Sequence, residues 1–445
     1  MREPDHPALS FIQVRTPHVT GRVAPRGLWL FHTAMGASLL IAALGGIVIG
    51  VLAATRSGTG ADRWLATVQA HATLQLWGWF ATFTTALVFE SIVRLNRRPP
   101  VAVPLRVAVL LLLAAGSVLL GTGSLVEDLA RWPSVGGALL LVVGACLFLW
   151  LVISVPSARP LAVDVHPLFF RAGATWLVVA AVGGLVASAR AEAGVMAPQW
   201  FEVMVECVLR GFIMNTVIAV ALRAYGHLGV PEVAVRTQLA LWGLVNGGLL
   251  LWLIGAPAFS SSGSLLVRGT ADILLALTMV WATLAFRIVG ILRAWRRDSE
   301  RPRIMVPLAW VGLLTYAALL AVQAASGIAR GASPMLLEAG AARHAFMLGF
   351  VAPLLIAMAH VVLDRFGTGH AHWRNALTVA FALLVVAWPL RVVPPLADTG
   401  LGSGSQMVVA VAGVVAATAL ILAAAVSARN GLAVAQFERG LRPRR

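Results

Sequence analysis

Two histidines lie inside long apolar stretches of this sequence, where an ionisable side chain is costly and is therefore a candidate for function. His71 opens the run HATLQLWGWF, and His344 opens the run HAFMLGF. Two neutral imidazoles that face each other across a gap of helix-packing width are what a low-spin haem iron needs, with one axial ligand from each side. The alternative is that both histidines only bond to neighbouring helices or to backbone carbonyls.

The residues around these histidines indicate what kind of haem they would hold. The sequence contains no Cys-x-x-Cys-His, so the haem would be b-type, bound by ligation, packing and its propionates. Gly78 and Gly349 would leave room for the macrocycle, with Gln75 as a further cofactor contact, and Arg343 would meet a propionate.

A second cluster of candidate residues lies in one apolar stretch in the middle of the chain. Glu202, Glu206 and Arg210 are spaced i, i+4 and i+8, which places them on one face of a helix, and Asn215 follows about one turn deeper. One interpretation is a proton relay or polar wall beside the cofactor, with Glu206 as the exchangeable carboxyl. The other is a compensated Glu–Arg pair that only holds helices together.

Membrane helices must position these side chains. The 445 residues are 59% hydrophobic and 12% charged, with a mean hydropathy of +0.87. The apolar residues fall in blocks about twenty residues long, without the period-two alternation of a membrane barrel. The sequence therefore predicts an all-α, polytopic membrane protein with about twelve spans, at 28–54, 65–92, 103–125, 135–156, 168–188, 199–223, 237–256, 269–292, 305–326, 337–363, 375–394 and 405–427.

The charge pattern predicts the topology of these spans. All 34 basic residues are Arg, and they concentrate in alternate loops, which is typical of the cytoplasmic side of a membrane protein. The net charge of +16 is therefore a topological signal and does not indicate nucleic-acid binding; the expected partner is the lipid bilayer. We expect residues 1–26 to be a cytoplasmic tail without a cleavable signal peptide, 27–428 a single membrane domain and 429–445 a second cytoplasmic tail.

This topology places the two histidines at one depth. Even-numbered spans start at the outer face, and His71 and His344 lie about 6 and 7 residues below the predicted starts of spans two and ten, or roughly 9–11 Å at 1.5 Å per residue.

At these residues the chain resembles the NnrS family, membrane haem proteins linked to nitric oxide and denitrification, and more distantly subunit I of the haem-copper oxidases. The resemblance lies in segment 71–94, in segment 343–369 and in Glu206 with the Arg-Gly-Phe that starts at Arg210. It implies a haem-copper oxidase subunit I-like bundle in a bacterial inner membrane, with His71 and His344 as axial ligands. It also implies a role in nitric oxide or nitrosative stress handling or in denitrification-linked redox, with nitric oxide as a small ligand and a quinone or another respiratory component as partner.

The chain departs from that pattern in ways that limit the expected chemistry. Spans six and seven contain no histidine, and no second histidine lies two residues from His344, so a binuclear reductase centre is not supported. No spacing of histidines or cysteines in the sequence indicates a copper site. An aromatic-proline signature expected near the N-terminus is replaced by the run LWLFH that starts at Leu28. The sequence leaves enzyme status open. The rival functions are a proton-coupled transporter without cofactor and an oxidase-like assembly component.

Overall fold

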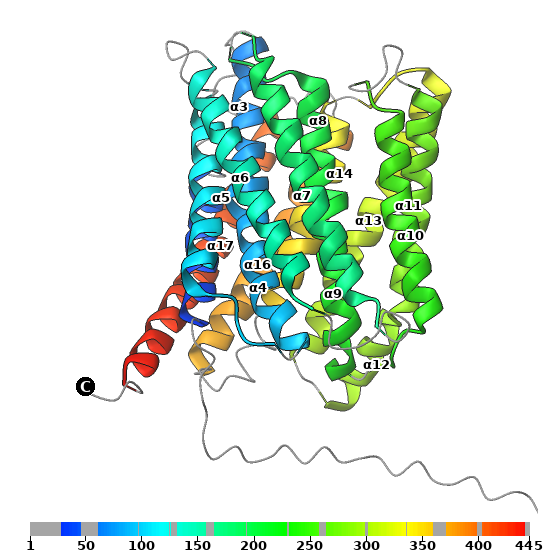
Figure 1. Ribbon diagram of the computed structural model, residues 1–445. Coiled ribbons are helices and arrows are strands. Elements are labelled where there is room, and N and C mark those ends of the chain that lie inside the picture. Colours follow the sequence, from blue (N-terminus) through cyan, green and yellow to red (C-terminus); the bar gives the residue numbers. More distant parts are fainter. Residues whose placement is uncertain are drawn as a thin grey trace, which may run out of the picture.

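The computed structural model of the chain is almost entirely helical (Figure 1). A single isolated bridge between Glu192 and Val195 is the one β pairing among the residues that the structure describes. The predicted all-α class is confirmed. The described residues are 28–45, 61–96, 98–123, 125, 131–156, 164–192, 194–228, 231–257, 264–298, 301–334, 336–358, 371–397 and 403–440.

Eleven helices in the described part of the chain are long and apolar enough to cross a membrane, which makes this a multi-pass membrane protein. A further apolar helix, α1 (Leu28–Leu44), is shorter, and the rest of the predicted first span lies outside the described residues. The eleven stretches are Trp64–Val93, Val103–Gly123, Trp132–Ser154, His166–Ala189, Pro198–Ala224, Val235–Ile254, Leu265–Arg293, Ile304–Arg330, Leu337–Met358, Asn375–Ala397 and Gly404–Gln436.

Most spans are formed by one α-helix. These are α5 (Val103–Gly123), α6 (Trp132–Ser154), α7 (His166–Ala189), α10 (Val235–Ile254), α11 (Leu265–Ala285), α13 (Arg301–Arg330), α16 (Ala371–Ala397) and α17 (Ser403–Gly440). A short helix, η5 (Tyr225–Leu228), follows span six, and α12 (Ile288–Asp298) begins within the last part of span eight.

Helix α17 continues well past the predicted end of the membrane domain at residue 428. Ser427, Asn430 and Val434 are buried at helical spacing, and α17 packs along α1, where Gly431 lies against His32. Because one face of the segment is covered by α1, the helix runs on to Gly440, and most of the predicted tail 429–445 is helical.

Among the described residues, three spans contain a complete π-helical segment flanked by α-helices. These segments begin 10, 9 and 8 residues after Trp64, Pro198 and Leu337, the first residues of their spans, so they lie at similar depth below the upper end of the bundle in Figure 1. Such segments are rare and frequently occur at functional sites. Span two is α3 (Ala61–Thr73), η2 (Leu74–Ala81) and α4 (Thr82–Leu95); span six is α8 (Pro198–Glu206), η4 (Cys207–Ile213) and α9 (Met214–Ala224); span ten begins with α14 (Leu336–His344) and η6 (Ala345–Val351).

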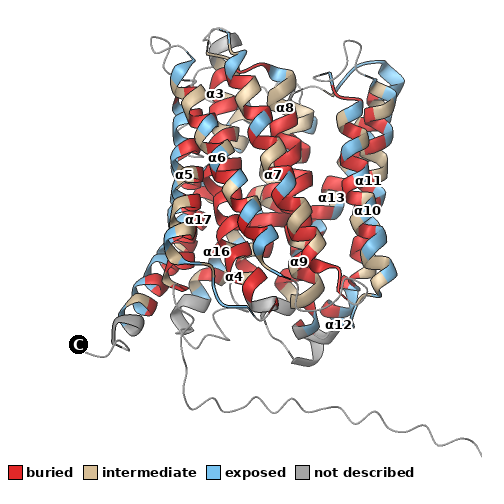
Figure 2. Cartoon of the chain, viewed as in Figure 1, coloured by how far each residue is buried: buried red, intermediate tan, exposed pale blue. Residues whose placement is uncertain are grey.

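The same three spans form the centre of the bundle. Their most apolar stretches are 89%, 89% and 72% buried for spans two, six and ten, against 33–56% for the other spans among the described residues. Exposed apolar side chains such as Leu111, Trp150, Ile254 and Leu284 lie on the surrounding helices, which carry the exposed residues in Figure 2. The bundle therefore places the candidate residues of spans two, six and ten away from lipid.

Candidate functional site

The two candidate ligands occupy equivalent places in spans two and ten. Each lies 7 residues after the first residue of its span, Trp64 or Leu337. His71 lies near the end of α3, shortly before η2, and His344 is the last residue of α14, directly before η6. The two histidines therefore lie at similar positions along their spans, and their equal depth in a membrane stays a prediction.

Backbone carbonyls orient both imidazoles. The Nδ1 of His71 lies 3.4 Å from the carbonyl oxygen of Gly45, and the Nδ1 of His344 lies 2.6 Å from that of Gly340. A carbonyl oxygen only accepts, so these contacts assign the proton of each ring to Nδ1 and leave the Nε2 lone pair available. The carbonyl contacts of the alternative interpretation are present, but they use only one nitrogen of each ring.

The two histidines belong to one cluster with an arginine of α16. The imidazole of His344 interacts electrostatically with His71 and Arg391, and His71 interacts with Arg391. Among the described residues, spans two and ten share few close backbone approaches, so the two histidines come from helices whose backbones are not in close contact. Protein surrounds all three residues, but each is only half-buried. Part of the surface of each therefore stays accessible.

Arg391 is a residue that sequence reasoning missed. It forms no hydrogen bond or ion pair with any residue that the structure describes, although it lies within a membrane span. A cation inside a membrane normally pairs with an anion, because leaving it unpaired is costly. The available signal was its position inside an apolar stretch, the same signal that identified the histidines.

Buried polar atoms without partners follow His71 along span two. The Thr73 hydroxyl and the indole Nε1 atoms of Trp77 and Trp79 have no hydrogen-bond partner, and these three residues are at most 1% exposed. Buried donors of this kind are normally satisfied, so each calls for a partner such as water or a ligand.

The other predicted cofactor contacts of spans two and ten pack against neighbouring helices. Gln75 donates from Nε2 to the carbonyl oxygen of Ala42 at 2.8 Å. A side chain on Gly78 would meet Ile41 and Ser117. Gly349 lies against Gly312 of α13 and Trp388 of α16. In this structure the two glycines allow close helix packing and do not leave open space for a macrocycle.

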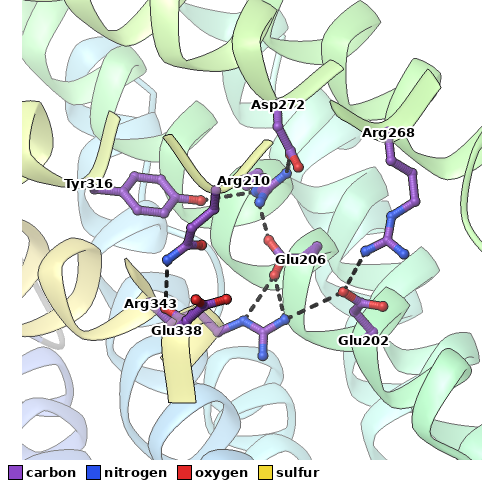
Figure 3. A network of polar contacts seen from close by, with 9 residues as sticks. Glu202, Glu206, Arg210, Arg268, Asp272, Tyr316, Glu338 and Arg343 are labelled. Carbon is purple, nitrogen blue, oxygen red and sulfur yellow. Dashed lines mark hydrogen bonds and ion pairs between the residues drawn. The ribbon is translucent and has the colours of Figure 1, made fainter. Parts of the chain in front are cut away.

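The carboxylate of Glu206 bridges two arginines. Its Oε1 accepts from Nε and Nη2 of Arg343 at 3.0 and 2.8 Å, and its Oε2 lies 2.7 Å from Nε of Arg210 (Figure 3). All three side chains come from spans six and ten. The predicted propionate contact, Arg343, is therefore already paired with a protein carboxylate.

Further polar and charged residues contact Glu206 and its two arginines. We call the whole set the outer ion network and define it as Glu202, Glu206, Arg210, Arg268, Asp272, Tyr316 and Arg343. Arg210 donates to Asp272 at 2.5 Å and to the Tyr316 hydroxyl at 3.0 Å, and Arg268 donates to Glu202 at 2.8 Å. The network therefore joins spans six and ten to α11 and α13 (Figure 3). The ring of Trp252 from α10 lies 5.6 and 5.1 Å from the guanidinium carbons of Arg210 and Arg268.

The sequence grouped Asn215 with Glu202, Glu206 and Arg210, but its side chain is not part of the outer ion network. Its side-chain amide forms reciprocal hydrogen bonds of 3.2 and 3.1 Å with Asn246 of α10, which also accepts from Trp176 of α7 at 2.7 Å. Asn215 lies a full helical turn beyond Arg210, and its face of span six contacts spans five and seven. It is a helix-packing residue in this structure.

Other histidines lie apart from this site. His166, the first residue of α7, pairs with Asp164 at 2.6 Å, and Asp164 also pairs with Arg223. His32 lines an apolar cavity of about 30 Å³ together with Met35 and Met358. The described residues contain no group of three or more His, Cys, Asp or Glu side chains suited to a metal ion.

Comparison with known proteins assigns no family to the chain: no family model matches it, and no curated protein is significantly similar to it.

Proposed function

We propose that this chain is a b-haem-binding protein of a bacterial inner membrane, with His71 and His344 as the axial ligands. The observation that carries the proposal is that two imidazoles from different spans interact electrostatically and that each has its Nδ1 directed to a backbone carbonyl. A ligating histidine needs such an outer contact, which fixes its tautomer and its ring orientation.

Other residues of the site fit a haem as well. Haem propionates are carboxylates, and Arg391 is a guanidinium without a described partner beside both histidines. Arg391 would therefore meet a propionate, the role that the sequence predicted for Arg343. The unpartnered donors of Thr73, Trp77 and Trp79 add hydrogen-bonding capacity in the span that carries His71.

A haem held by His71 and His344 would supply one-electron transfer, and a gas would bind the iron only if one of the two histidines left. The residues of this chain would hold the iron, orient it and shield it from lipid. A role in nitric oxide or nitrosative stress handling rests on the resemblance to the NnrS family. Both termini would then lie in the cytoplasm, as the distribution of Arg predicts.

An optical spectrum of the detergent-purified protein tests the haem. We expect sharp α and β bands after dithionite reduction and a pyridine haemochrome of the b type, with both lost in His71→Ala and in His344→Ala. His32→Ala is the matched control, since it removes another buried membrane histidine outside the site, and it should keep the bands. A variant lacking both ligands that kept full haem would exclude the assignment.

The rival function is a transporter without cofactor, in which the charged face of span six lines a substrate path. The observation in its favour is the membrane-embedded outer ion network itself. A colourless protein from cells with ample haem would support this alternative, and haem bands would oppose it.

A further inference from the structure

Arg343 and His344 are consecutive residues that connect the outer ion network to the candidate haem site. Arg343 is bonded to Glu206, and its charge also acts on the imidazole of His344. No other described residue belongs to the network and directly precedes a candidate ligand. A change of charge in the network therefore changes the electrostatic potential at His344.

The network is electrically balanced among the described residues. It holds three arginines, Arg210, Arg268 and Arg343, and three carboxylates, Glu202, Glu206 and Asp272. An arginine does not lose its proton in proteins, so the positive charges are permanent. Glu206 is 3% exposed and contacts two of the arginines, so its loss would leave one uncompensated positive charge in a poorly solvated place.

We propose that Glu206 is a positioning residue that holds Arg343 and offsets its charge beside His344, so that the outer ion network sets the reduction potential at this ligand. The proposal rests on the proposed haem function and assigns the network a role in it. The oxidised cofactor carries one more positive charge than the reduced one. Unpaired positive charge nearby therefore favours reduction, and unpaired negative charge opposes it.

The test is a spectroelectrochemical titration of the α band in Glu206→Gln, Arg343→Gln and the double variant. Glu206→Gln leaves positive charge unpaired and should shift the midpoint to more positive potential. Arg343→Gln leaves negative charge unpaired and should shift it to more negative potential. The double variant removes both charges and should return close to wild type.

Two further variants keep the test decisive. Glu192→Gln removes an exposed carboxylate outside the network and should not shift the potential. Glu202→Gln serves if Glu206→Gln does not fold: the Glu202 side chain is 31% exposed and lies 3.9 Å from Arg343, so the shift should have the same sign as for Glu206→Gln and be smaller.

Shifts of the same sign in both single variants, or a double variant that does not return toward wild type, would overturn the electrostatic role while leaving the haem assignment in place. A wild-type protein without haem would remove the proposed function and this inference together.

Discussion

At the candidate haem site, each histidine directs one ring nitrogen to a backbone carbonyl, which leaves the lone pair of the other ring nitrogen available. The carbonyl of Gly340 comes from the same helix as His344, four residues earlier, whereas that of Gly45 belongs to a different span from His71. The sequence identified both histidines because an ionisable group in a membrane span is unusual. It could not reveal the Gly45 partner of His71, which depends on how the first span packs against span two.

Arg391 provides a prediction at this scale. Arg391→Gln should speed haem loss roughly ten- to hundredfold, the effect of losing one hydrogen bond to a charged group at about 1.5–3 kcal/mol. Transfer of haem to apomyoglobin measures the rate. Arg330→Gln is the control, because the Arg330 side chain is 47% exposed on α13. Equal rates in both variants would exclude Arg391 from the site.

At the scale of elements, the three π-helical segments are the feature that hydropathy could not predict. Each contains one glycine, Gly78 in η2, Gly211 in η4 and Gly349 in η6, and each glycine lies against a neighbouring helix. Gly78 and Gly349 were predicted to leave room for a cofactor, because a glycine alone does not show whether a helix or a ligand fills its place. Asp272 lies inside the predicted span 269–292, but the sequence could not show that it pairs with Arg210 of span six.

The crossing of α13 and η6 gives a prediction for packing. A side chain on Gly312 would overlap the backbone of Gly349, which cannot move aside as a flexible side chain can. Gly312→Ala should therefore destabilise the fold by about 1–3 kcal/mol, the usual effect of overpacking, and disturb the span that carries His344.

Thermal unfolding in detergent, followed by circular dichroism, measures this loss. Gly243→Ala in α10 is the matched control, since nothing lies within 4 Å of the added carbon, and it should leave stability unchanged or raised. If the two variants unfold at the same temperature, the close crossing contributes nothing to stability.

At the scale of the whole molecule, the helical architecture was largely predictable because a bilayer requires long apolar helices. The ends of the predicted and observed spans generally agree within about four residues, as for 65–92 and Trp64–Val93. The main difference is α17, whose extension depends on contacts with α1. The sequence also did not show that spans two, six and ten are central, because hydropathy does not separate a lipid-facing apolar helix from a buried one.

Topology supplies the prediction at this scale. A green fluorescent protein fused after residue 445 should fluoresce, and alkaline phosphatase at the same place should be inactive, because the arginine-rich ends of the spans are expected in the cytoplasm. The same pair of reporters inserted after Gly194, between α7 and α8, should give the opposite pattern. Matching patterns at both places would contradict the topology.

The π-helical segments also make the length of a span part of the site. Deleting one residue between His344 and Gly349 would leave every candidate residue in the sequence. The part of span ten above the deletion would nevertheless rotate by about 100° and move by about 1.5 Å, one residue of a helix. His344 would then turn away from His71, and Arg343 from Glu206. Relatives that keep all these residues but differ in length by one residue here would therefore lack the same site.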